Sequence, residues 1–292
     1  MEKLRHFGTK AKEFWRRAPK GPLVILIILF TTGIFADFLA FGHDPEIGDP
    51  RQRLLPPFWY EGGMSKYPLG TDTMGRDTLT RLIYGSRVSL VVSFSAVIVS
   101  SVIGTVLGIL AGYFRGWVDQ VIMRFTDSWL SIPTVMFGIL LAVIIGPGVW
   151  NIVIIMGLVF WTRYARVTRG ETLSLRSRDF VQLAIVAGCS KFRIMRKHIL
   201  PNVLNNVITI ASLQIGVCVV VEASLTFLGV GVPPPKPAWG LMLSEGRGGL
   251  LAGYWWLIMF PGVAIAMLVM SFNLIGDWLR LYLDPHYRNI MD

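Results

Sequence analysis

The sequence predicts an all-α fold, that of a polytopic membrane protein with six transmembrane helices. Of the 292 residues, 53% are hydrophobic and 16% are charged, whereas about a quarter of the residues in a soluble domain are charged. The mean hydropathy is +0.56. The apolar residues gather in six runs, and most Lys and Arg residues lie in the segments between them. These observations exclude an ordinary soluble domain and favour a chain that crosses a bilayer several times.

The first apolar run covers residues 22–41. About 20 residues rising about 1.5 Å each cross a hydrocarbon core of roughly 30 Å, so this run predicts the first transmembrane helix. A signal peptide would have a shorter apolar core, so we expect an uncleaved anchor. The preceding segment, 1–21, carries seven Lys and Arg residues, which predicts a cytoplasmic tail. The segment that follows, 42–87, balances six basic with six acidic residues and is predicted to be an extracytoplasmic loop.

Residues 88–284 are predicted to form a five-helix core. Its apolar runs lie at 88–112, 122–145, 149–164, 206–230 and 255–279. The triplet Gly146-Pro147-Gly148 breaks helices and predicts a tight reversal at the membrane surface. Six crossings place the C-terminal tail, 285–292, on the same side as the N-terminal tail, and this side then holds 20 of the 28 Lys and Arg residues. That side is therefore predicted to be the cytoplasm.

Three glycines in the run 88–112 recur every four residues: Gly104, Gly108 and Gly112. At this spacing their bare backbones form one smooth ridge along a helix, which allows another helix to approach closely. The ridge predicts helix packing within the chain or with a second subunit. The alternative is a moving seam that opens during transport.

The run 206–230 carries Gln214, Cys218 and Glu222 on one helix face. A carboxylate at membrane depth must face protein, water or a partner, so Gln214 and Glu222 are candidate residues of a translocation path. In the alternative interpretation, Ser224, Thr226 or backbone groups bind the carboxylate of Glu222 in a rigid packing contact.

A basic segment, 163–205, separates the fourth and fifth runs. Its middle predicts a short amphipathic helix that Gly188 ends, followed by a second helix from Phe192 to Leu200 that Pro201 stops. Two interpretations stay open for this pair. It lies on anionic membrane lipid, or it is a rigid knob that docks into a partner protein.

The spacing in this segment resembles the coupling signature of ABC importer permeases, a helix that docks on the ATPase. The matching residues are Gln182, Leu183, Ala184, Gly188, His198, Leu200 and Pro201. Gln182, Leu183 and His198 depart from the Glu, Ala and Ile of the family pattern. The resemblance implies docking through Ala184 and Gly188, within a cytoplasmic coupling loop at 165–205.

A second block, Pro68-Leu-Gly-Thr-Asp-Thr-Met-Gly-Arg-Asp77, precedes the second run. It resembles the dipeptide, oligopeptide and nickel permeases, specifically the subunit type with the long first outer loop. The resemblance implies the type I importer permease fold and a place in the bacterial inner membrane. It further implies a heterodimer with a sister permease, two ATP-binding subunits that hold ATP and Mg, and an extracytoplasmic substrate-binding protein.

The residues themselves favour a non-catalytic chain without a cofactor. There is no Gly-x-x-x-x-Gly-Lys-Ser/Thr phosphate loop, the four histidines are scattered, and the two cysteines offer neither a disulfide framework nor a metal cluster. Nucleic acid is not an expected partner, because no stacking aromatics interleave the basic residues. Two alternatives remain: a nickel-importing permease of the same family, or a secondary transporter driven by an ion gradient with Glu222 as its ion site.

Overall fold

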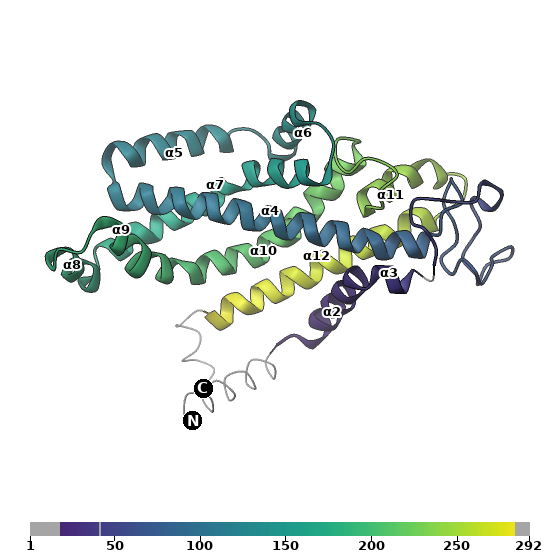
Figure 1. Ribbon diagram of the computed structural model, residues 1–292, viewed down its shortest axis with the longest axis horizontal. Coiled ribbons are helices and arrows are strands. Elements are labelled where there is room, and N and C mark those ends of the chain that lie inside the picture. The colour runs from purple at the N-terminus through teal and green to yellow at the C-terminus, as the bar shows by residue number, and fades with distance from the viewer. Residues whose placement is uncertain (1–17, 41, 284–292) are drawn as a thin grey trace, which may run out of the picture.

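The computed structural model describes residues 18–40 and 42–283, and every regular element within them is a helix. Four long helices run along the main axis of an elongated bundle (Figure 1): α4 (Thr78–Phe114), α7 (Val149–Arg176), α10 (Leu200–Phe227) and α12 (Trp256–Leu283). The prediction of an all-α fold is confirmed. The predicted tail 285–292 lies outside the described residues, and so do positions 1–17 of the predicted tail 1–21.

The first predicted span, 22–41, is a shorter helix than expected. Helix α2 (Lys20–Ile34) has 15 residues, and a four-residue helix, α3 (Ala36–Leu39), follows it. Arg87 of α4 donates hydrogen bonds to the last carbonyls of α2, at Gly33 (2.8 Å) and Ile34 (3.2 Å), and so satisfies the helix end at that point. The same guanidinium pairs with Asp37 of α3 at 2.9 Å.

The third predicted span, 122–145, is not one helix. Helix α5 (Gly116–Leu130) and helix α6 (Thr134–Ile145) meet at an angle of 93°. Pro133 lies in the break, and a proline both lacks the backbone donor of a helix interior and disfavours helical geometry in the residue before it. The prediction of one unbroken helix at 122–145 was wrong, because the apolar run continues through a residue that interrupts the helical backbone.

The helices support fewer crossings than the six predicted. Among the described residues, three helices are long and apolar enough to cross a membrane, or four if the bent α5–α6 pair forms one crossing. Helix α2 is too short for this criterion. Helix α7 is long, but four arginines follow its apolar first half: Arg163, Arg166, Arg169 and Arg176. The predicted span, 149–164, is therefore only the first part of a longer helix.

The predicted coupling loop, 165–205, is mostly helical. Helix α7 continues to Arg176, and α8 (Asp179–Val186) and α9 (Lys191–Ile194) form a hairpin at one end of the molecule (Figure 1). A π-helical turn, η2 (Met195–Ile199), then leads directly into α10. The expectation that Pro201 stops the helix was wrong, because Pro201 lies in the first turn of α10, where its missing N–H costs little.

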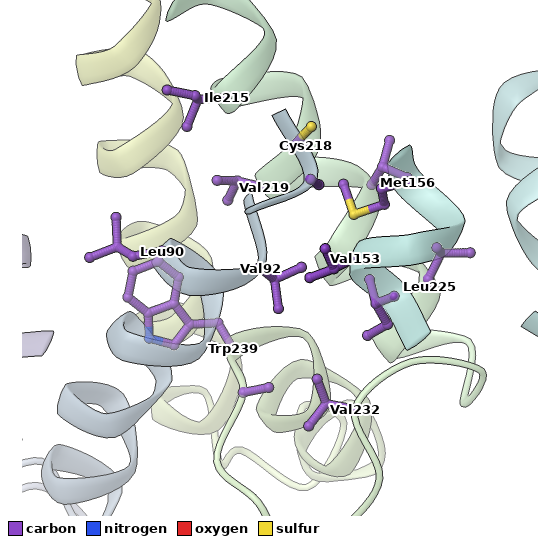
Figure 2. Close-up of a cluster of buried hydrophobic side chains, with 14 of the residues drawn as sticks. Leu90, Val92, Val153, Met156, Ile215, Cys218, Val219, Leu225, Val232 and Trp239 are labelled. Carbon is purple, nitrogen blue, oxygen red and sulfur yellow. The ribbon is translucent and has the colours of Figure 1, made fainter. Parts of the chain in front are cut away.

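The opposite end of the bundle carries the long first loop and α11 (Trp239–Gly246), with two 3₁₀ turns, η1 (Pro50–Gln52) and η3 (Arg247–Gly249) (Figure 1). Trp239 joins this end to the bundle, since its indole Nε1 donates to the carbonyl of Leu82 in α4 at 2.9 Å. Figure 2 shows the buried core beside it, where side chains of three long helices and Trp239 converge: Leu90 and Val92 of α4, Val153 and Met156 of α7, and Ile215, Cys218, Val219 and Leu225 of α10. Between helices that cross a bilayer, such side chains contribute through close van der Waals packing.

Candidate functional site: the α8–α9 hairpin

Helix α8 ends at a turn that requires glycine. Gly188 has a φ of +76°, in the left-handed region that side chains disfavour. The N–H of Gly188 donates to the carbonyl of Ile185 (3.0 Å), and the N–H of Cys189 donates to the carbonyl of Ala184 (3.0 Å). These two bonds form a complete Schellman motif, which satisfies the last carbonyls of the helix. Ser190 then caps α9 by accepting the N–H of Arg193.

The inner face of the hairpin is anchored in an apolar cluster, here called the inner-end cluster. It contains Ile109 and Tyr113 of α4, Tyr164 of α7, Val181 and Ala184 of α8, Ile194 of α9, Ile199 of η2, and Val203 and Val207 of α10. All of these side chains are buried. The cluster thus packs the hairpin against three long helices in one close-packed unit.

The outer face of the hairpin presents apolar side chains to its surroundings. Leu183 is 68% exposed and Val186 is 84% exposed, and Phe192 of α9 is also exposed. Nothing lies within 4 Å of the position that a Cβ atom of Gly188 would occupy. The exposed tip of the hairpin therefore consists of Leu183, Val186, Gly188 and Phe192, and Ala184 points away from it into the inner-end cluster.

The remaining residues of the coupling signature shape the base of the hairpin. Gln182 donates from Nε2 to the carbonyl of Arg176 at 2.7 Å, which ties α8 to the end of α7. The His198 ring lies 6.4 Å from the ring of Phe180. Leu200 packs on the inner-end cluster, and Pro201 is exposed.

The tip is surrounded by positive charge. Exposed cations follow the turn at Lys191, Arg193, Arg196 and Lys197, and none of them forms an ion pair with another residue in the described part of the chain. Lys191 lies over the ring of Phe114 at the end of α4, 5.6 Å from its centre. An apolar tip with free cations around it can bind a protein surface that offers an apolar groove with acidic edges.

Polar contacts stiffen the helices that carry the hairpin. Arg169 of α7 pairs with Asp119 of α5 through two hydrogen bonds, and this partner raises the pKa of Arg169. Asn206 of α10 donates to Glu171 of α7. Burial raises the pKa of Glu171, and the bond from Asn206 opposes that shift. Helices α5, α7 and α10 are thus joined near the hairpin.

The glycine ridge packs on α7 along the same half of the molecule. A Cβ atom on Gly104 would collide with the carbonyl oxygen of Trp161, and one on Gly108 would lie 2.5 Å from the carbonyl oxygen of Ala165. A Cβ atom on Gly112 would lie 2.7 Å from the Cβ of Thr172. The ridge is therefore a contact within this chain.

The two candidate path residues lie inside the chain's own bundle. Glu222 is fully buried and accepts hydrogen bonds from Ser89 of α4 (3.2 Å) and from Thr226 one turn along α10 (3.0 Å). Thr226 in turn accepts the N–H of Val232 at 3.2 Å. Gln214 is also buried and accepts from Arg163 at 3.5 Å. This geometry favours the alternative interpretation of Glu222 as a packing contact.

A substitution of Glu222 separates the two interpretations. Gln has the same shape, and its amide can still accept from Thr226 and donate to Ser89, so we expect Glu222→Gln to retain uptake and its dependence on pH. Glu222→Ala leaves a cavity and removes the acceptor of the Ser89 and Thr226 hydroxyl groups, and should lower the free energy of unfolding by about 2–4 kcal/mol. Both variants are compared with the parent chain for uptake in proteoliposomes, and thermal unfolding shows whether each variant is folded. A folded Glu222→Gln variant without uptake would restore the path interpretation.

The sequence analysis missed a buried cluster of charges at the outer end. Arg76 donates to Asp72 (2.6 Å) and to Glu245 of α11 (2.8 Å), and Arg81 of α4 donates to the same Glu245 oxygen at 3.0 Å. Both arginines are 1% exposed. The block Pro68–Asp77 thus ties the first loop to α11 and α4.

The described residues contain no group of three or more His, Cys, Asp or Glu side chains placed to hold a metal ion. The sequence contains no Gly-x-x-x-x-Gly-Lys-Ser/Thr phosphate loop.

Comparison with known proteins gives the family. Residues 104–289 match the family described as binding-protein-dependent transport system inner membrane component. The chain is 37% identical to the di/tripeptide transport system permease protein DppC of Pseudomonas aeruginosa, over 97% of this chain and 94% of the relative. It is 39% identical to the dipeptide transport system permease protein DppC of Haemophilus influenzae, over 95% of each chain. The glutathione transport system permease protein GsiD of Pectobacterium atrosepticum is 35% identical over 96% of this chain and 93% of its own length.

A solved structure gives the fold. A chain of the methionine ABC transporter MetNI, in an inward-facing conformation, matches with a TM-score of 0.57 at 18% identity, over 70% of this chain and 96% of that chain. The apolar helices and the family agree on a multi-pass protein of the inner membrane. The chain therefore belongs to the binding-protein-dependent transport system inner membrane components, the permeases of ABC importers, in the branch that contains the dipeptide permeases.

Proposed function

We propose that this chain is the permease subunit of an ATP-driven importer of dipeptides or oligopeptides. It forms the translocation path with a sister permease, and an extracytoplasmic binding protein delivers the peptide. The names of the relatives, two dipeptide permeases and a glutathione permease, support a peptide as cargo. The chain itself is proposed to be non-catalytic and without a cofactor, and two separate ATP-binding subunits hold ATP and Mg.

The observation that carries the proposal is the exposed apolar tip on a rigidly anchored hairpin. The tip enters a groove of an ATP-binding subunit through Leu183, Val186, Gly188 and Phe192. Ala184, which the family pattern implied as a contact, instead anchors the hairpin. When ATP closes the pair of ATP-binding subunits, the docked hairpin moves as a rigid body and tilts α7 and α10, exchanging inward for outward access. The hairpin end is therefore the cytoplasmic end, as the excess of Lys and Arg on that side supports.

Leu183→Asp tests the docking face. A charge at the centre of an apolar contact should weaken binding of the ATP-binding subunits by at least about 30-fold, the effect of losing a hot spot worth about 2 kcal/mol. The measurement is co-purification of the ATP-binding subunits and uptake of a labelled dipeptide into proteoliposomes loaded with ATP. Ile47→Asp is the matched control, because Ile47 is similarly exposed, at 73%, but lies in the outer loop. Equal losses in both variants would count against docking at the hairpin.

Reconstituted uptake also separates the rival functions. A peptide importer requires ATP inside the vesicles, whereas a secondary transporter continues without ATP and stops when the ion gradient collapses. The buried, hydroxyl-bonded Glu222 supports the first outcome. A nickel importer of the same family would take up labelled nickel instead of the dipeptide.

A further inference from the structure

The outer end of the molecule exposes a group of apolar side chains that the transport mechanism above does not use. Phe58, Trp59 and Tyr60 are each more than half exposed. In the turn that leads into α12, Leu250 is half exposed and Leu251 is 99% exposed. We call these five residues the outer aromatic patch.

The first three members are held on a tight turn. The N–H of Tyr60 donates to the carbonyl of Pro57, and the N–H of Gly63 donates to the carbonyl of Tyr60, each at 2.9 Å. A Cβ atom on Gly63 would collide with the carbonyl oxygen of Pro57, so the backbone at the two ends of the turn is in close contact. The N–H of Phe58 donates to the carbonyl of Pro68 at 3.3 Å. The aromatic side chains are therefore presented in a fixed position at little further cost in conformational entropy.

Ring contacts place the patch beside the start of a membrane span. The Trp59 ring lies 6.3 Å from the ring of Phe260, and the Tyr60 ring lies 6.0 Å from that of Trp255. Helix α12 begins at Trp256 and is apolar enough to cross the membrane from there. Phe260 lies one turn inside that helix, so Trp59 packs on the flank of the span and not on its outer end.

We infer that the outer aromatic patch lies in the boundary between headgroups and acyl chains of the outer leaflet, and binds phospholipid there. Tyr and Trp are favoured at this depth because an apolar ring and a polar edge meet both environments. Two neighbours on α12, Met259 and Val263, are apolar and exposed, so the patch continues into a surface suited to hydrocarbon.

This contact gives the long outer loop a second attachment. The charged cluster of Arg76, Arg81 and Glu245 fixes the loop to α4 and α11, and the patch fixes its tip to the membrane. These two attachments together fix the height of the outer loop above the bilayer.

The test uses spin labels on the complete importer in nanodiscs of phosphatidylethanolamine and phosphatidylglycerol. Phe58→Cys carries the label in a Cys189→Ser background. Met74→Cys is the control, because Met74 is equally exposed in the same loop, at 56%, but lies in the segment of the charged cluster, where its N–H donates to Asp72. Buried Cys218 does not react. Tyr60→Cys gives a second reading if Phe58→Cys does not fold.

We expect the label at position 58 to be relaxed severalfold more by oxygen, which concentrates in lipid, than by water-soluble nickel-EDDA, relative to the label at 74. Equal access of nickel-EDDA to both labels would overturn the inference. So would a label at 58 that neither reagent reaches, because that result means that another protein covers the patch.

Discussion

Gly188→Val is expected to abolish ATP-driven uptake while the chain still folds and inserts. The φ of +76° at this position disfavours every L-residue, most of all a β-branched one, by about 1–2 kcal/mol or more. A shift of the backbone here opens the Schellman bonds of Gly188 and Cys189 and moves the tip of the hairpin. Because the tip transmits the motion of the ATP-binding subunits, a displaced tip separates ATP hydrolysis from transport.

A second variant separates backbone geometry from bulk. Asn tolerates the left-handed region better than other residues with a side chain, so Gly188→Asn keeps the turn and adds atoms to the tip. Apart from the residues next to Gly188 in the sequence, no atom of this chain lies within 4 Å of that new Cβ. A loss of uptake in a folded Gly188→Asn variant that binds the ATP-binding subunits weakly or not at all therefore indicates a collision with the docked partner. Retained uptake in this variant, with loss in Gly188→Val, assigns the effect to the turn.

The chain contains a matched control for both variants at its opposite end. Gly229 has a φ of +85°, has nothing within 4 Å of its Cβ position, and closes α10 with the same pair of bonds, from Gly229 to Thr226 and from Val230 to Leu225. Gly229→Val introduces the same strain far from the hairpin. ATPase activity and dipeptide uptake are measured together in proteoliposomes. Docking at the hairpin is contradicted if Gly188→Val transports as well as Gly229→Val.

The hairpin itself was predictable from sequence, but the direction of its side chains was not. An amphipathic stretch that ends in glycine indicates a short helix and its stop, and the structure has α8 end at Val186 with Gly188 in the turn. Which of Leu183 and Ala184 faces outward depends on how α8 lies on α4 and α7. That is a tertiary contact, and the helical period alone cannot fix it.

The wrong predictions about helix breaks also arise from tertiary contacts that the sequence does not show. Pro133 and Pro201 look alike as helix breakers. Pro133 lies in a 93° bend, whereas Pro201 lies in the first turn of α10, directly after a π-helical turn. The outer charged cluster was missed because Glu245 lies 164 residues beyond Arg81. Because the basic and acidic residues within 42–87 are equal in number, nothing in the sequence indicated that Arg76 and Arg81 pair with Glu245 of α11.

Gly108→Ala is expected to destabilise the chain strongly, although alanine is the better helix former. The added Cβ would lie 2.5 Å from the carbonyl oxygen of Ala165 and 2.8 Å from the Cβ of Thr168, and both belong to the rigid body of α7. The two helices must separate to admit it, and overpacking of this kind costs about 1–3 kcal/mol. Gly104→Ala should lower the free energy of unfolding by at least as much, because its Cβ would lie even closer to a backbone carbonyl oxygen, that of Trp161.

Gly170→Ala, on the same pair of helices, is expected to stabilise the chain. Gly170 lies within α7 next to Arg169, and nothing lies within 4 Å of its Cβ position. Alanine at this position should raise the free energy of unfolding by up to about 1 kcal/mol, because it has a higher helix propensity than glycine. Thermal unfolding in detergent, followed by size-exclusion chromatography, compares the variants: Gly170→Ala should unfold at or above the temperature of the parent chain, and Gly108→Ala well below it. If both unfold at the same temperature, α4 and α7 part easily at the ridge, and the moving seam becomes the better interpretation of the three glycines.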